Sequence, residues 1–440
     1  MPQEEYFETA QVKQVSTINI PVEIPVSELE KQINKQVQGL IYEDDGSGRS
    51  GRENVNFKIW KRENISVVAD DDLFHIKVPL KAWAKADLKF DKLGLNLSES
   101  KDTEFALDLN FTTRLSVNTD YQIISETAGN GYEWIKKPVL KLGPLEVSLG
   151  SFAGPIIENT QKEISQLLDQ QIKDKINIKK HVELAWNNIQ KPYLLSKEHN
   201  AWLKLIPVEI LMTPLHGDSQ QINATIGIKG YTQSYINQRP TDTIASVMPP
   251  LQLVDSINDD FAINFTGEIS HARANEILTQ KFINKNFKFK NGKREVTITD
   301  LDLYGSGENL IIKADLTGSI DGTIYLSGIP HYDETTRSLV VHNLDYDLDT
   351  KNALAKTANW LLKSRMVKNF EEALQIPLGN QMDQARSIIE QNIDHKTLAK
   401  GIILNGSLDE LTPSAVYMTS DAIVALIKAT GKAEVKINGL

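Results

Sequence analysis

The sequence contains no cysteine, which removes several classes of chemistry at once. Disulfide bonds, thiolate nucleophiles and cysteine-based metal sites are all excluded. No stretch approaches the roughly 18 to 20 consecutive apolar residues that a membrane-spanning helix needs. Positive charge is not in excess either, since 48 Lys and Arg stand against 58 Asp and Glu, for a formal net charge of -10. Binding to nucleic acid through the whole surface is therefore disfavoured, and we expect no nucleic-acid partner.

The beginning of the chain leaves the cellular location open. Residues 1–10 are acidic and carry no apolar segment of the kind found in signal peptides. The sequence is therefore compatible with a cytoplasmic protein. It is equally compatible with the mature part of an exported protein whose leader has been removed.

Motifs for catalysis and metal binding are also missing. No two histidines are spaced i, i+4 with an intervening glutamate, and neither Gly46-Ser47-Gly48 nor Gly305-Ser306-Gly307 continues into a phosphate loop. Asp345, Asp347 and Asp349 would share one face of a strand, where carboxylates could bind calcium. We favour a solvated outer face instead, because the alternate positions of this segment are apolar. We expect no metal, no cofactor and no enzymatic activity, with a site assembled from distant residues as the alternative.

The strongest pattern is an alternation of apolar and polar residues that lasts far beyond an ordinary strand. It runs from Phe74 to Phe90, and a second run spans residues 105–117. At about 3.3 Å per residue the first run would extend for roughly 50 Å, whereas typical strands have about five or six residues. Such alternation indicates an antiparallel sheet with one buried face. Because long twisted strands do not stay flat, we expect a curled sheet with helices inside the curve.

Several segments have the apolar spacing of amphipathic helices. The first follows Ser27 and Glu30, which match a capping box, and a longer one follows Pro155. Further helices are predicted to begin near Ser270 and near Asn352.

The order of these elements repeats along the chain. A strand runs into a short helix and is followed by several strands and a long helix, first from residue 18 and again from residue 261. The predicted fold is therefore α+β, with two tandem modules in which a long curved antiparallel sheet wraps around long helices. We place the modules at residues 1–198 and 199–440, and residues 199–260 are candidates for a sheet shared by both.

Blocks of residues along most of the chain resemble a bacterial family known as domain of unknown function 4403. They occur in the family's order and are Tyr132-Glu133-Trp134 with Pro138; Trp202-Leu203 with Pro207; Gly318, Gly322 and Ile324-Tyr325-Leu326-Ser327-Gly328 with Pro330, Tyr332 and Asp333; and Leu344-Asp345-Tyr346-Asp347-Leu348 with Asn352, Leu354 and Trp360.

That family is similar to the tubular lipid-binding superfamily, which includes bactericidal/permeability-increasing protein and the clostridial toxin-cluster proteins. The resemblance implies a curved sheet around a long helix, with lipid in the apolar interior. This chain departs from bactericidal/permeability-increasing protein in being acidic and in lacking cysteine for its disulfide. Binding of endotoxin is therefore not carried over.

The residues that would contact lipid follow from combining this implication with the apolar stripes. Small side chains in the middle of the longest strand would either let a helix approach closely or leave room for an acyl chain. The candidate lipid-binding residues are Ile33, Val37, Val78, Ala82, Ala84, Ala86, Ile164, Leu168, Ile172, Leu354 and Leu361.

The sequence is compatible with two functions. The first is a lipid or fatty-acid binding or transfer protein of the bacterial cell envelope, located in the periplasm, at the cell surface or outside the cell, that transiently meets a membrane surface. The second is a structural or protein-interaction module of the same fold whose core is filled by its own side chains. The sequence does not determine the oligomeric state.

Overall fold

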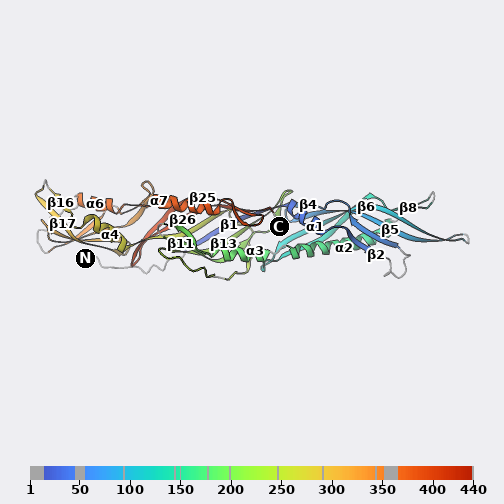
Figure 1. Cartoon of the computed structure of the whole chain (residues 1–440), viewed down its shortest axis with the longest axis horizontal. Coiled ribbons are helices and arrows are strands. Elements are labelled where there is room, and N and C mark those ends of the chain that lie inside the picture. The colour runs from blue at the N-terminus through green and yellow to red at the C-terminus, as the bar shows by residue number, and fades with distance from the viewer. Residues whose placement is uncertain are drawn as a thin grey trace.

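A long rod of curled antiparallel sheet makes up most of the molecule (Figure 1). A central sheet occupies the middle of the rod, and a smaller end sheet lies toward each end. The sheets are accompanied by a smaller number of helices, and the fold is broadly α+β. The computed structural model describes residues 14–44, 55–92, 95–142, 145–148, 150–175, 178–197, 200–244, 247–289, 292–341, 344–350 and 365–438.

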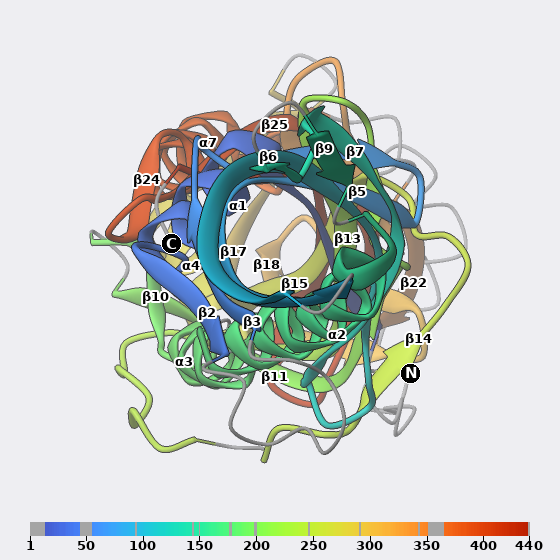
Figure 2. The same ribbon diagram turned by 90° about the vertical axis from the view of Figure 1, so that its right-hand side faces the viewer.

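The first end sheet is built around two very long strands. Its members are β2 (Leu40–Asp44), β3 (Val55–Lys61), β4 (Ser66–Asp70), β5 (Leu73–Lys92), β6 (Leu95–Val117) and β7 (Ile123–Lys136). β5 pairs antiparallel with β6 along the whole length of β5, from Leu73↔Arg114 to Lys92↔Leu95, which confirms the long alternating strands. The order is β2-β3-β5-β6-β7 with β4 paired to β5, so β7 is an edge strand. Seen along the rod, β5 and β6 bend around a central axis with α2 at the side (Figure 2).

The central sheet combines strands from widely separated parts of the chain. Its members, in spatial order, are β10 (Tyr193–Ser196), β11 (Ala201–Met212), β13 (Gln221–Tyr235), β1 (Val15–Pro25), β15 (Asp260–Ser270), β26 (Ala422–Ile437), β25 (Ile402–Met418) and β24 (Lys396–Ala399). Two short strands, β12 (His216–Gly217) and β14 (Leu251–Leu253), pair with β13 and β11.

The middle of this sheet is where the two halves of the sequence meet. β1 and β15 pair antiparallel at Thr17↔Ala262 and Ile18↔Phe261. The Ser16 hydroxyl accepts a hydrogen bond from the Asn264 backbone N–H at 3.0 Å. Outward from this pair, β13, β11 and β10 follow on one side, and β26, β25 and β24 follow in the corresponding order on the other. The domain boundary predicted at residue 198 falls between the paired strands β10 and β11, and it stays a prediction.

The second end sheet has the order β16-β17-β18-β19-β22. Its strands are β16 (Asn286–Phe289), β17 (Arg294–Ser306), β18 (Asn309–Gly318), β19 (Gly322–Gly328) and β22 (Asp345–Thr350). Smaller sheets are formed by β8 (Val139–Leu142) with β9 (Leu145–Ser148), and by β20 (Pro330–Asp333), β21 (Ser338–Val341) and β23 (Ile376–Pro377).

The helices largely follow the sequence-based expectations. They are α1 (Val26–Gln36), α2 (Gly150–Lys175), α3 (Ile178–Ile189), α4 (His271–Phe282), α6 (Arg365–Ala373) and α7 (Gly379–Ile393). Ser270 caps α4, since its side chain accepts a hydrogen bond from the Arg273 backbone N–H. The helix predicted from Asn352 lies mostly outside the described residues. None of the helices in the described ranges is long and apolar enough to span a membrane.

The capping box predicted at Ser27 and Glu30 is wrong. α1 begins at Val26 with Pro25 as its N-cap residue, and no side chain caps it. The Glu30 carboxylate instead accepts a hydrogen bond from the backbone N–H of Val67 at 2.7 Å. A tertiary contact with β4 has taken the side chain that the local motif would use, and it binds α1 to the first end sheet.

Glycines stand opposite β-bulges at corresponding places in the central sheet. β11 is bulged after Pro207, the partner of Gly230, and β25 is bulged after Leu408, the partner of Gly431. A Cβ on Gly230 would lie 2.6 Å from the Ile206 carbonyl oxygen. A Cβ on Gly431 would collide with the Ser407 carbonyl oxygen and lie 2.6 Å from a ring carbon of Phe261. Each bulge therefore needs a glycine, which has no side chain, at the facing position of the neighbouring strand.

We expect Gly230→Ala and Gly431→Ala each to lower the free energy of unfolding by about 1–3 kcal/mol, the range for overpacking. Gly267→Ala is the matched control, because its Cβ would meet only a side-chain atom of Ile427 at 3.4 Å. Urea unfolding followed by circular dichroism measures the difference. Equal stabilities for all three variants would contradict the close approach at the bulges.

Candidate functional site

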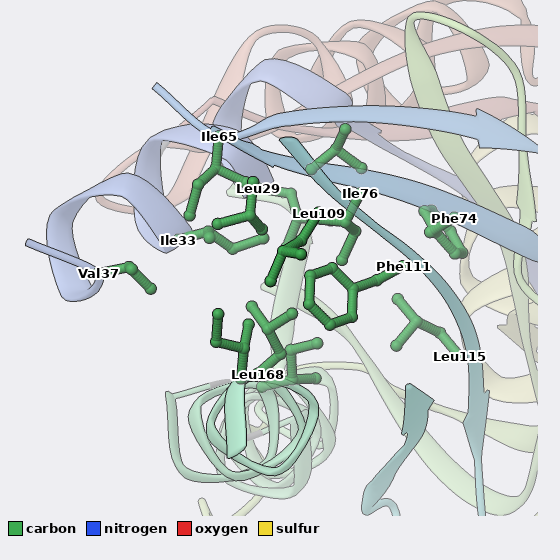
Figure 3. Packing of buried hydrophobic residues seen from close by; sticks show 14 of the residues in the cluster. Leu29, Ile33, Val37, Ile65, Phe74, Ile76, Leu109, Phe111, Leu115 and Leu168 are labelled. Atoms are coloured by element: carbon green, nitrogen blue, oxygen red, sulfur yellow. The ribbon is translucent and has the colours of Figure 1, made fainter. Parts of the chain in front are cut away.

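The concave face of the first end sheet is lined by apolar side chains. They come from β3, β5 and β6 and alternate with the solvated residues of the outer face, as the period of the strands requires. The buried members include Phe57, Ile59, Val78, Leu80, Ala82, Ala84, Phe105, Leu107, Leu109 and Phe111. α1 and α2 complete this interior, and Figure 3 shows Leu29 and Ile33 of α1, Leu168 of α2 and Phe111 of β6 converging on it.

Most of the residues predicted from the sequence to contact lipid meet in this one cluster. Those that the structure brings together are Ile33, Val37, Val78, Ala82, Ala84, Ile164, Leu168 and Ile172. Ala86 continues β5 and pairs with Val55 and Lys101, but its side chain is not described. Leu354 and Leu361 lie outside the described residues. The residues grouped in this cluster are buried together by packing. Their contact with lipid stays a prediction.

A small apolar void lies among these side chains where α2 begins to cover the sheet. It is lined by Phe57, Ile59, Leu80, Phe105, Leu107, Leu109, Ile156, Ile157 and Thr160. Its volume of ≈ 10 Å³ is close to the smallest space that holds one water molecule. Thr160 is the polar member, and its hydroxyl donates to the Ile156 carbonyl oxygen at 2.8 Å. In this conformation the protein's own side chains therefore fill the region around the void.

One polar group interrupts the apolar face, and the sequence interpretation overlooked it. Thr113 falls in the inward series of β6 between Phe111 and Leu115, and it is buried. Its hydroxyl lies 2.9 Å from that of Thr127, its partner on β7. A threonine at an inward position of an otherwise apolar strand was the available signal.

The hydroxyl groups at this place converge on a carboxylate from α2. Ser125 Oγ and Thr127 Oγ1 each donate to Asp169 Oδ1 at 2.6 Å. The Thr127 backbone N–H donates to Asp169 Oδ2 at 3.3 Å. With three donors, the carboxylate is stabilised in a partly buried place without a cation.

A second polar contact joins the same helix to the same strand nearer the void. Gln161 Nε2 donates to the Gly131 carbonyl oxygen at 2.9 Å. Gly129 allows this approach, because a Cβ there would lie 3.0 Å from the side-chain carbonyl carbon of Gln161. We call these two sets of contacts between α2 and β7, centred on Asp169 and Gln161, the α2–β7 seam.

Aromatic side chains lie on the edge strand next to the void. Trp134 and Tyr132 pair in register with Leu107 and Leu109, which both line the void. The Trp134 ring meets Phe105 edge-on at 5.7 Å and Tyr132 at 5.4 Å. Trp134 is partly buried against the core, whereas Tyr132 is 40% exposed. An apolar surface thus leads from solvent at the edge of the sheet toward the interior.

The opposite end of this interior is covered by residues 239–244 and 247–251, which we call the strap. Lys204 of β11 is buried, and its Nζ donates to the carbonyl oxygens of Thr241 and Thr243 at 3.0 and 2.8 Å. The Tyr121 hydroxyl donates to the Pro249 carbonyl oxygen at 2.5 Å. The Leu251 side chain is buried in the same apolar cluster. The strap therefore connects the central sheet to the turn after β6.

A larger groove elsewhere has a different character. It has a volume of ≈ 410 Å³ and is lined by residues that include Arg337, Asp383 and Arg386. Arg337 holds Asp383 with two hydrogen bonds of 2.6 and 3.1 Å, which lowers the pKa of that carboxyl. Its charged lining does not suit an apolar chain. Within the described ranges, no group of three or more His, Asp or Glu is placed to hold a metal ion.

With this geometry established, the family follows from comparison with known proteins. The family model for a domain of unknown function (DUF4403) matches residues 14–437. The chain belongs to the DUF4403 family. The resemblance noted from the sequence blocks is confirmed at that level, and no curated protein matches the chain.

Solved structures offer more distant comparisons for this family member. The crystal structure of lipopolysaccharide binding protein is 11% identical, with 96% of this chain and 99% of that chain covered and a TM-score of 0.29. The crystal structure of P47 of Clostridium botulinum E1 is 10% identical, with coverages of 93% and 97% and a TM-score of 0.20. Scores this low carry no argument about a ligand.

The strap contact gives a prediction about alkaline stability. Burial raises the pKa of Tyr121 to about 12, whereas an unfolded tyrosine titrates at about 10. Between these values the unfolded state binds fewer protons than the folded state, so the free energy of unfolding falls as the pH rises. We expect Tyr121→Phe to show a smaller fall across this window in urea unfolding.

Tyr235→Phe serves as the control, because the Tyr235 hydroxyl donates to Gln233 of its own strand, rather than to the strap, at 2.8 Å. It should keep the wild-type slope of stability against pH. A Tyr121→Phe slope equal to that of the wild type would contradict the burial of this hydroxyl under the strap.

Proposed function

We propose that the protein binds a molecule with an apolar chain, a lipid or fatty acid, between the concave face of the first end sheet and α2. The observation that carries this proposal is the apolar void, which lies beside an edge strand and is bounded on one side by α2. The wall around it is apolar except for Thr160, whose hydroxyl is already satisfied. Such a site holds its ligand by burial and offers nothing for chemical transformation.

The free energy that is lost when α2 moves away is similar in size to the free energy that is gained when an acyl chain is buried. Moving α2 away would expose Ile156, Ile157, Ile164, Leu168 and Ile172, which are buried. Exposing one such side chain costs about 1.5–3 kcal/mol, so the total is on the order of 10 kcal/mol. A 16-carbon chain gains on the order of 12 kcal/mol from burial before ordering costs. The interior would thus close on itself in water and open when an acyl chain can replace the helix contacts.

The repeated order of the central sheet supports a proposal about the architecture. We interpret the chain as two tandem modules that share this sheet, one beginning with β1 and α1 and the other with β15 and α4. In both, the helix starts at the residue after the strand ends. Each module would then curl one end sheet around its helices.

We also propose where the protein works and how it meets its ligand. We expect a lipid-binding protein without enzymatic activity, located in the bacterial periplasm, at the cell surface or outside the cell. Transient contact with a membrane surface would supply the ligand. Fractionation of the native cells tests the location directly.

The small size of the void favours a second candidate function. A module whose core is filled by its own side chains would serve as a structural or protein-interaction element. It would need no movement of α2 and would leave the protein free of lipid.

Native mass spectrometry of the protein purified from bacteria, with organic extraction, distinguishes the two candidates. We expect stoichiometric bound lipid in the wild type and a strong reduction in Ile157→Trp, because the larger ring would occupy the wall of the void. Leu167→Trp is the matched control, since this residue lies on the same helix and is 37% exposed. It should bind as much lipid as the wild type.

Circular dichroism verifies that the variants fold, and Ile157→Phe provides a smaller change if Ile157→Trp does not. A wild-type protein that stays free of lipid, even after incubation with mixed liposomes, would exclude the carrier function and leave the self-filled module. Equal lipid content in the Ile157 and Leu167 variants would show that lipid binds somewhere other than at the void.

A further inference from the structure

We propose that α2 and β7 form a lateral gate, and that an apolar chain enters sideways through the α2–β7 seam. This inference rests on the proposed lipid-binding function and adds its route of entry. The seam is the place where the curled first end sheet presents an edge strand to a helix.

A helix cannot continue the hydrogen-bonded ladder of a sheet, so the contacts that join α2 to β7 differ from those inside the sheet. β5 and β6 are joined by a continuous antiparallel ladder. Across the seam, the Thr127 N–H and the Gly131 carbonyl oxygen have side-chain partners, Asp169 and Gln161. Side-chain contacts of this kind open without disturbing the sheet, since water can replace each of them.

The other helix at this interior is held more firmly. α1 follows β1 without an intervening residue, and the Val26 N–H donates to the Gln220 carbonyl oxygen at 2.8 Å. The Asn34 side chain also exchanges two hydrogen bonds of 2.8 Å with the backbone of Ile65. A movement of α1 would break backbone pairing in the central sheet and contacts to β4, so α2 is the helix that can move.

The end of the interior next to the central sheet is less suited to entry than the seam. The strap closes the end near the central sheet through Tyr121 and Leu251. The void lies on the other side of this closure, and its neighbours on the edge strand are Trp134 and Tyr132. A chain that enters between α2 and β7 would meet these rings first and the void directly behind them.

The polar cluster explains how such a gate closes in one position. Thr113, Ser125 and Thr127 lie where the inward series of β6 and β7 would otherwise be apolar. In the closed position Asp169 of α2 accepts hydrogen bonds from the hydroxyls of Ser125 and Thr127, and the Thr127 hydroxyl in turn lies 2.9 Å from that of Thr113. The cluster therefore acts as a latch that sets the register of α2 on β7, whereas apolar packing alone would tolerate sliding.

The test uses the absence of cysteine from the chain, because two introduced cysteines can pair only with each other. Ser125→Cys combined with Asp169→Cys introduces thiols on two side chains whose oxygens lie 2.6 Å apart in the native protein. Thr323→Cys combined with Asp315→Cys is the matched control, since these oxygens also lie 2.6 Å apart but join neighbouring strands of the second end sheet. The probe is a pyrene-labelled fatty acid delivered from phosphatidylcholine vesicles.

We expect the oxidised seam variant to take up no probe and the reduced form to take it up at least as fast as the wild type. The oxidised and reduced control should both behave like the wild type. Should the seam disulfide not form, a short bifunctional maleimide closes the same gap. If the cross-linked seam variant takes up the probe as fast as its reduced form does, the gate is overturned and the binding function is left intact. No uptake by any protein, wild type included, would overturn the proposed function itself.

A second variant tests the latch without cross-linking. Asp169→Asn keeps the shape of the side chain and removes its charge, so we expect uptake faster by about tenfold, as for the loss of one hydrogen bond to a charged group. Asp174→Asn is the control on the same helix, where the carboxylate accepts a hydrogen bond from Gln170 of α2 itself at 2.8 Å. Equal rates for these two variants would overturn the role of the latch.

Discussion

The need to bury one face of very long strands governs the structure. β5 and β6 are apolar on every second residue over most of their length, and a flat sheet would leave that face in water. Twist bends the sheet around its apolar face, and α1 and α2 fill the space inside. The rod-like shape, the length of α2 and the void beside it all follow from this requirement. The central sheet then joins the two halves through the short contact between β1 and β15.

A curled sheet that does not close leaves edge strands, and the way β7 is covered determines what the protein can do. Its backbone faces a helix, so the contact is made by side chains such as Asp169 and Gln161. Burial of Leu168 and its neighbours keeps the helix closed in water. A membrane or an acyl chain would offer these apolar surfaces another partner, so the packing that stabilises the fold would also permit the ligand exchange that we propose. Closed packing with a small void and a lipid-binding function are therefore compatible.

Much of this was accessible from the sequence because it depends on local periodicity. The alternation from Phe74 and the apolar spacing after Ser270 predicted β5 and the start of α4 correctly. The capping box at Ser27 failed because Glu30 found a partner in Val67, a contact that local spacing does not encode. The pairing of β1 with β15 joins residues far apart in the chain, which periodicity cannot specify. Thr113 was visible as a break in the inward series of β6, but its link through Thr127 to Asp169 depends on the positions of three elements.

Hydrogen exchange measured with and without phosphatidylcholine vesicles shows whether α2 moves while the curled sheet stays intact. If the seam opens to admit lipid, the Thr127 amide and residues of α2 exchange faster when vesicles are present, and the β5–β6 ladder is unchanged. Protection of α2 that stays the same while lipid binds would contradict this opening, and so would equal loosening of α2 and the ladder.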